Sequence, residues 1–181
     1  MMQFKLFELL DNESTYNDLI SLFGKQAVYK FSNSIIGITY DYGANNYVEI
    51  LKKVKNFNLR QVIITSSSFL RAINYGVDKD IQINEIKFIY PILPESVIQV
   101  QDYIEMINAT EGEEKKYNKN KLFKEIDWIT SDECIDIKCI SFDLKNEEQL
   151  YYKTELYNNG VLLVNDKTII KNVAEFINNT L

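Results

Sequence analysis

Apolar residues in the middle of the chain recur with two spacings, which separate expected strands from expected helices. Short apolar runs at 35–40, 61–65 and 81–90 favour β-strands, and amphipathic spacing of three or four residues favours helices between them. Such alternation is typical of βαβ crossovers. We therefore predict an α/β fold with a largely parallel central sheet built from βαβ units over residues 34–110, in a single domain covering 1–181; an α+β fold is the alternative. The expected helices of this region cover residues 45–56, 66–76 and 94–107, and the apolar side of the last comprises Val97, Ile98, Val100, Tyr103, Ile104 and Ile107.

Residues 1–33 are predicted to form an entry unit of a helix and a strand. Thr15 or Ser14 can act as the helix N-cap, and Gly24 lies where a glycine commonly ends a helix. The apolar residues of 27–31 then favour a strand.

The C-terminal part of the chain predicts mainly strands. The highly charged residues 111–121 indicate a solvated loop, and strands are expected at 126–129 and 134–142. The sequence Asn-Asn-Gly at 158–160 lies between two apolar runs and is a strong β-hairpin signal. A closing helix is expected over 169–177.

The acidic composition of the chain bears on its partners and its location. The formal net charge is −6 and the isoelectric point is near 4.8. This charge opposes non-specific binding to nucleic acid or anionic membrane, and it favours a partner with a basic surface. Neither a signal peptide nor an apolar run of about 18 residues, as a membrane-spanning helix requires, is present. We therefore expect a cytoplasmic protein.

The chain contains no histidine, which excludes several kinds of catalytic and metal site. A Ser-His-Asp or Cys-His nucleophile, an imidazole base and a histidine-bound zinc ion all require that side chain. Neither a glycine-rich phosphate-binding loop nor a dinucleotide-binding fingerprint replaces them. We accordingly expect no cofactor. Cys134 and Cys139, five positions apart, are predicted to be unpaired buried thiols on opposite faces of one strand.

The first candidate site is the edge at which the predicted parallel strands end. Ligands of such sheets bind beyond the carboxyl ends of the strands, where helix N-termini offer backbone N–H groups. A hydroxyl-rich turn with an arginine in the following helical turn favours a phosphate or carboxylate, while a capped helix beside a solvated arginine is the simpler interpretation. The residues predicted to line the site are Asp41, Gly43, Ser66, Ser67, Ser68 and Arg71.

The second candidate site consists of Asp127, Asp136 and Lys138. An acid on one strand, followed on the next strand by an acid and a lysine two residues apart, resembles the motif of the PD-(D/E)xK nucleases. The resemblance implies that Asp127 and Asp136 would hold Mg²⁺ and that Lys138 would stabilise charge near the attacking water. It spans only residues 127–138, and the proline of the motif is missing.

Two functions therefore remain open at the level of the sequence. The twelve tyrosines and the acidic charge suit a non-enzymatic binding or accessory protein that acts through protein–protein interaction. Frequent Ile, Asn, Lys and Tyr follow AT-rich codons, so a virus or mobile element is a candidate source. A Mg²⁺-dependent nuclease is the alternative, and we favour the binding protein.

Overall fold

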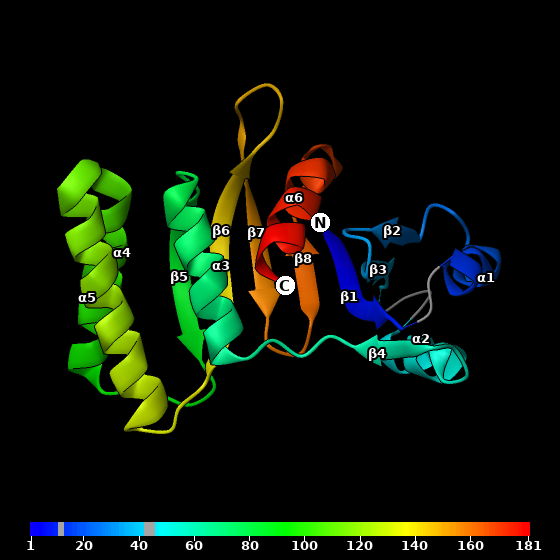
Figure 1. The fold of residues 1–181 in the computed structure, drawn as a ribbon, viewed down its shortest axis with the longest axis horizontal. Coiled ribbons are helices and arrows are strands. Elements are labelled where there is room, and N and C mark those ends of the chain that lie inside the picture. Colours follow the sequence, from blue (N-terminus) through cyan, green and yellow to red (C-terminus); the bar gives the residue numbers. More distant parts are fainter. Residues whose placement is uncertain (11–12, 42–45) are drawn as a thin grey trace.

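The computed structural model describes residues 1–10, 13–41 and 46–181, and within these residues eight strands form one sheet (Figure 1). Seven strands follow the order β2-β3-β1-β8-β7-β6-β5, and β4 pairs with β1. The strands are β1 (Met2–Leu9), β2 (Val28–Lys30), β3 (Ile35–Thr39), β4 (Leu59–Gln61), β5 (Gln82–Phe88), β6 (Ile137–Lys145), β7 (Tyr151–Tyr157) and β8 (Val161–Val164). The helices are α1 (Glu13–Phe23), α2 (Tyr47–Val54), α3 (Ser66–Asp78), α4 (Pro94–Ala109), α5 (Gly112–Ser131) and α6 (Ile170–Thr180), with the short 3₁₀ turn η1 (Lys167–Ile169) before α6.

The predicted parallel sheet is wrong. Every strand pairing in the described part of the chain is antiparallel, so the fold is α+β, the alternative fold class. Most local predictions are nevertheless confirmed: the helix from 94, the strand within 81–90, the hairpin around 158–160 and the closing helix all form. The error therefore lies in how the elements pair rather than in where most of them are.

Strand β1, which the sequence analysis did not predict, explains the error. One edge of β1 pairs with β3; its other edge pairs first with β8, through Met2–Lys5, and then with β4, through Phe7–Leu9. Because β3 and β4 are both antiparallel to β1, they run in the same direction, as a βαβ crossover requires. They are separated by β1, however, so no parallel pair forms between them.

Three segments also differ in local structure from their predictions. Of the strand expected at 61–65, only Gln61 belongs to a strand, and residues 62–65 form an extended connection to α3. The expected loop at 111–121 and the expected strand at 126–129 both belong to α5. Leu122, Ile126 and Ile129 are fully buried, and their spacing of four and three residues places them on one helical face. Of the charged residues before them, Glu113, Glu114 and Lys116 are exposed, whereas Lys115 and Lys119 are largely buried.

Two hydrophobic cores lie on either side of β1. Phe4 and Leu6 join the larger core, which the sheet shares with α3, α4, α5 and α6. Phe7 and Leu9 join the smaller core with α1 and α2. In Figure 1, α3 and α6 cross the front of the sheet, while α1 and α2 lie beside β1–β4. Alternation along β1 therefore connects the two halves of the molecule.

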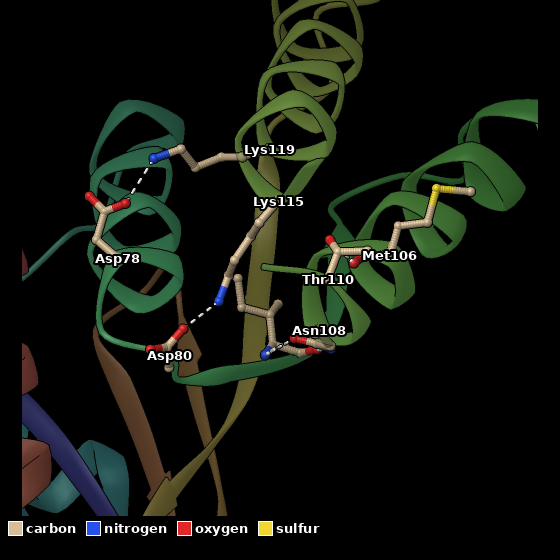
Figure 2. Close-up of polar contacts among 8 residues, drawn as sticks. Asp78, Asp80, Met106, Asn108, Thr110, Lys115 and Lys119 are labelled. Carbon is tan, nitrogen blue, oxygen red and sulfur yellow. Dashed lines mark hydrogen bonds and ion pairs between the residues drawn. The ribbon is translucent and has the colours of Figure 1, made fainter. Parts of the chain in front are cut away.

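The helical pair α4–α5 is tied to α3 and β5 by polar contacts (Figure 2). Lys115 and Lys119 of α5, both largely buried, form ion pairs of 2.5 Å with Asp80 and 2.9 Å with Asp78. The hydrogen bond and charge of Lys115 lower the pKa of Asp80. At the end of α4, the Asn108 side chain accepts from the Ile83 backbone N–H at 3.2 Å and donates to its carbonyl oxygen at 2.6 Å. These contacts hold α4 alongside β5.

Lys5 is a fully buried lysine at the centre of the sheet. Its ammonium donates to the Asn159 carbonyl oxygen in the β7–β8 turn and lies 5.7–6.0 Å from the ring centres of Tyr47 and Phe7. No described carboxylate forms an ion pair with it. Burial lowers the pKa of Lys5 to about 8. Gly160, with φ of +73°, completes this turn, and a Cβ there would collide with the Val62 carbonyl oxygen.

We expect Lys5→Met to change how stability depends on pH. Between pH 8 and pH 10.5 the unfolded wild-type chain holds a proton on Lys5 that the folded chain releases. The unfolding free energy of the wild type should therefore rise relative to that of Lys5→Met by up to about 3 kcal/mol across this range, with a constant difference below it. Urea denaturation at a series of pH values measures this difference. The exposed Lys30→Met is the control, and a difference that stays constant throughout contradicts the prediction.

Candidate functional site

The predicted anion-binding turn forms the N-terminus of α3. Thr65, rather than one of the serines, is the N-cap, and its hydroxyl accepts from the Ser68 backbone N–H at 3.3 Å. The Thr65 hydroxyl also lies 2.9 Å from that of Ser67, and Arg71 donates to the Ser68 hydroxyl at 3.1 Å. The structure thus brings together Ser66–Ser68 and Arg71, as the sequence predicts, with several of their polar groups bonded to one another.

Ser66 joins this turn to the second candidate site. Its hydroxyl donates to Asp136 Oδ1 at 2.8 Å and accepts from the Ile137 backbone N–H at 3.2 Å. The Asp136 carboxylate therefore sits beside the N-terminus of α3, where the helix dipole favours a negative charge. An external anion at this turn would meet a carboxylate of the protein itself, so anion binding by Ser66–Ser68 and Arg71 stays a prediction.

Asp41 of the predicted anion site does not lie at the same strand ends as the Ser66 turn. Asp41 follows β3, whose end lies beside the start of β1, where the Tyr40 backbone N–H donates to the Gln3 carbonyl oxygen at 3.0 Å. The Ser66 turn instead follows residues that bond to the β7–β8 turn, at the opposite edge of the sheet. Successive antiparallel strands end at opposite edges, so the common edge expected for parallel strands does not exist. Gly43 lies outside the described residues.

The structure also changes the setting of the nuclease-like triplet. Asp127 belongs to α5 rather than to the strand that the motif requires, and its carboxylate accepts from the Ser131 hydroxyl at 3.3 Å. Asp136 contacts Ser66, and Lys138 is an exposed residue of β6. Within residues 1–10, 13–41 and 46–181, no group of three or more acidic or cysteine side chains is placed to hold a metal ion. The geometry therefore gives the nuclease alternative no support.

A groove lies between β5 and α4, and the sequence did not predict it. Its volume is about 510 Å³, within the usual range of ligand-binding clefts. The wall from α4 includes Val97, Val100 and Gln101, and Lys138 of β6 also borders it. The strand wall and the segment after it supply mainly apolar side chains: Ile86, Phe88, Ile89, Tyr90, Pro91 and Ile92.

Exposed apolar residues continue from the groove onto the surface. Tyr90, Val97 and Ile98 are between 51% and 68% exposed, and Leu93 is nearly half exposed. The sequence predicts Val97 and Ile98 on the apolar side of this helix, yet both are exposed. The width of the apolar stripe could have revealed this exposure. Val100, Ile104 and Ile107 already form one buried face of α4, so apolar residues outside that face extend toward solvent. Exposed apolar residues beside a groove are a common feature of interaction surfaces.

Charge is distributed unevenly around the groove. Helix α4 carries Glu95, Asp102 and Glu105, all exposed, and contains no lysine or arginine. Gln101, in the groove wall, donates to Glu105 Oε1 at 3.1 Å. Lys138 forms no ion pair with the described residues, whereas Lys87 pairs with Glu85 at 3.1 Å. The groove therefore combines an apolar centre with an acidic helix on one side and a free ammonium group near the strand.

The two cysteines differ more than the sequence predicts. Both are free thiols; Cys139 is buried in β6, but Cys134 lies before that strand and is exposed. The prediction that both are buried is therefore wrong for Cys134, which has a positive φ of 56° in the turn after α5. Burial raises the pKa of the Cys139 thiol to about 12.

No family model, curated protein or solved structure matches the chain. In the described ranges, no helix is both long and apolar enough to cross a membrane.

The thiols should react in two separate steps. With a disulfide reagent at pH 8, we expect Cys134 to react promptly and Cys139 to react only on unfolding, because its thiolate is rare in the folded protein. Absorbance of the released thiol measures both steps, and Cys134→Ser should remove the fast one. Two equally fast thiols in the folded wild type, or none after denaturation without reductant, would contradict this expectation.

Ser66 should contribute to stability because it links α3 to β6. Ser66→Ala removes the hydrogen bonds to Asp136 and Ile137, and we expect the unfolding free energy to fall by about 1 kcal/mol. Ser67→Ala, which loses only a contact with the Thr65 hydroxyl, is the matched control. Urea denaturation compares the two variants, and equal losses would show that the Ser66 link adds nothing.

Proposed function

We propose that the protein is a non-enzymatic binding protein that holds another protein at the groove between β5 and α4. The observation that carries this proposal is the exposure of Val97 and Ile98 beside a groove with an apolar wall. Exposing such side chains to water opposes the hydrophobic effect, and burial against a partner removes that cost. Protein interfaces typically have an apolar centre and a polar rim, which is the composition of this surface.

The charge of α4 supports a partner with a basic surface. Three exposed acidic side chains, at positions 95, 102 and 105, border the apolar residues, with no basic residue on the same helix. A lysine- or arginine-bearing partner would be attracted and oriented by this arrangement. The net charge of −6 acts in the same direction over longer distances.

The proposal includes a cytoplasmic location and an accessory role, as expected for a protein encoded by a virus or mobile element. Two free thiols support the location, because secreted proteins of this size commonly pair their cysteines. The partner would then be a protein of the same compartment.

Photo-cross-linking tests this function. A benzophenone amino acid at position 98 should capture a partner in cells that express the chain, whereas the same group at the exposed Ile63 should not. The triple variant Glu95→Lys, Asp102→Lys and Glu105→Lys should abolish the adduct through charge repulsion.

The matched control changes the net charge equally at exposed acids outside the α4–α5 pair: Asp18→Lys, Glu147→Lys and Glu148→Lys. This control should retain the adduct. The proposal is contradicted if position 98 captures nothing beyond what position 63 captures, or if both triple variants behave alike.

A further inference from the structure

Strand β5 is the last strand of the sheet, and part of its outer edge is open. The Asn108 side chain bonds to both the N–H and the carbonyl group of Ile83, which closes the edge at one end (Figure 2). From Glu85 to Phe88, hydrogen bonds from described residues reach the β5 backbone only from β6, on the inner side. Unpaired groups on an edge strand are a template for a further strand.

Helix α4 runs back along this edge and forms the opposite wall of the groove. Asn108 contacts Ile83 at one end, and Val97 lines the groove with Phe88 at the other. From Val97 to Asn108 a helix rises about 16 Å, and from Ile83 to Phe88 a strand also advances about 16 Å. The helical and strand segments therefore have about the same length, and the groove between them runs along β5.

The two ends of the groove carry opposite charges. By the same helical rise, Glu105 is level with Glu85, and it is joined to the groove wall through its hydrogen bond from Gln101. At the other end, Lys138 lies next to Ile137, the register partner of Phe88. An occupant that lies along β5 therefore meets Glu85 and Glu105 at one end, with Glu85 also paired to Lys87 of the groove wall. Apolar side chains lie in the middle, and the Lys138 ammonium group lies at the other end.

We propose that the groove accepts an extended segment of the partner protein, which adds to the sheet as a strand antiparallel to β5. This inference rests on the proposed function and specifies how the partner is held. In the antiparallel direction, the N-terminal end of the segment lies near Lys138 and carries a carboxylate. Its centre is apolar, and its C-terminal end carries a lysine or arginine near Glu85 and Glu105. Backbone hydrogen bonds supply affinity in such strand addition, and side chains supply selectivity.

Two synthetic peptides provide the first test: acetyl-DTVTVTK-amide and its reverse, acetyl-KTVTVTD-amide. Titration calorimetry with the full chain should show the first binding about tenfold more tightly, since only its charges match in the antiparallel direction. Lys138→Glu should remove this preference. Equal affinities for the wild type, or no binding of either peptide up to about 1 mM, would overturn the strand model.

Adjacent residues of α4 offer a matched pair of variants. Val97 lines the groove and Ile98 does not, although both are exposed, so neither change should prevent folding. We expect Val97→Gln to weaken peptide binding about tenfold and Ile98→Gln to change it less than about twofold. An equal effect of the two substitutions would place binding on the general surface of α4 and overturn the groove as the site.

Backbone methylation tests the strand pairing itself. In a strand, alternate N–H groups point to the same side, so N-methylation of either the threonines or the valines blocks only one edge. Loss of binding in one of these two peptides alone supports pairing with β5, and loss in both or in neither overturns it. If the peptides fail while position 98 still cross-links to a partner, the strand model falls and the proposed function stands.

Discussion

The position of β1 between β3 on one edge and β8 and β4 on the other is the constraint on which the rest of the structure depends. Its alternating side chains enter two different cores, so its register couples the α1–α2 side of the molecule to the α3–α6 side. A shift by one residue would exchange these faces. Lys5 reinforces the register at the cost of burying an ammonium group, because its bond to the β7–β8 turn exists only in this alignment.

The antiparallel arrangement that β1 imposes also distributes the polar loops. In a parallel sheet the hydroxyl-rich turn before α3 and Asp41, just after β3, would meet at one edge, but here they lie at opposite edges. The turn that remains, with Ser66 bound to Asp136, links a helix to a strand. Residues that are candidates for a chemical role in the sequence thus connect elements of the fold. The open surface lies elsewhere.

The groove between β5 and α4 lies where the sheet ends, at its last strand β5. The α4–α5 pair is anchored at the start of β5 by Asn108, Lys115 and Lys119, and it covers the larger core from the side. Near the end of β5 the anchoring contacts cease, and an apolar groove with charged ends remains. Edge strands are commonly protected against unwanted pairing. Here the Asn108 side chain closes the edge at Ile83 and register irregularities interrupt the pairing beside Glu85 and Phe88, while no described residue outside β6 bonds to the backbone of Glu85–Phe88.

The sequence by itself determined most elements, because helix periodicity, the N-cap near Thr65 and the Asn-Asn-Gly turn are local properties. It did not reveal β1, in which Lys5 interrupts the apolar pattern and both faces are buried. It also assigned Val97 and Ile98 to the core, since periodicity shows which side of a helix is apolar but not whether a neighbour covers it. Only the tertiary structure decided strand direction and the exposure of α4, because both depend on contacts between residues far apart in the chain.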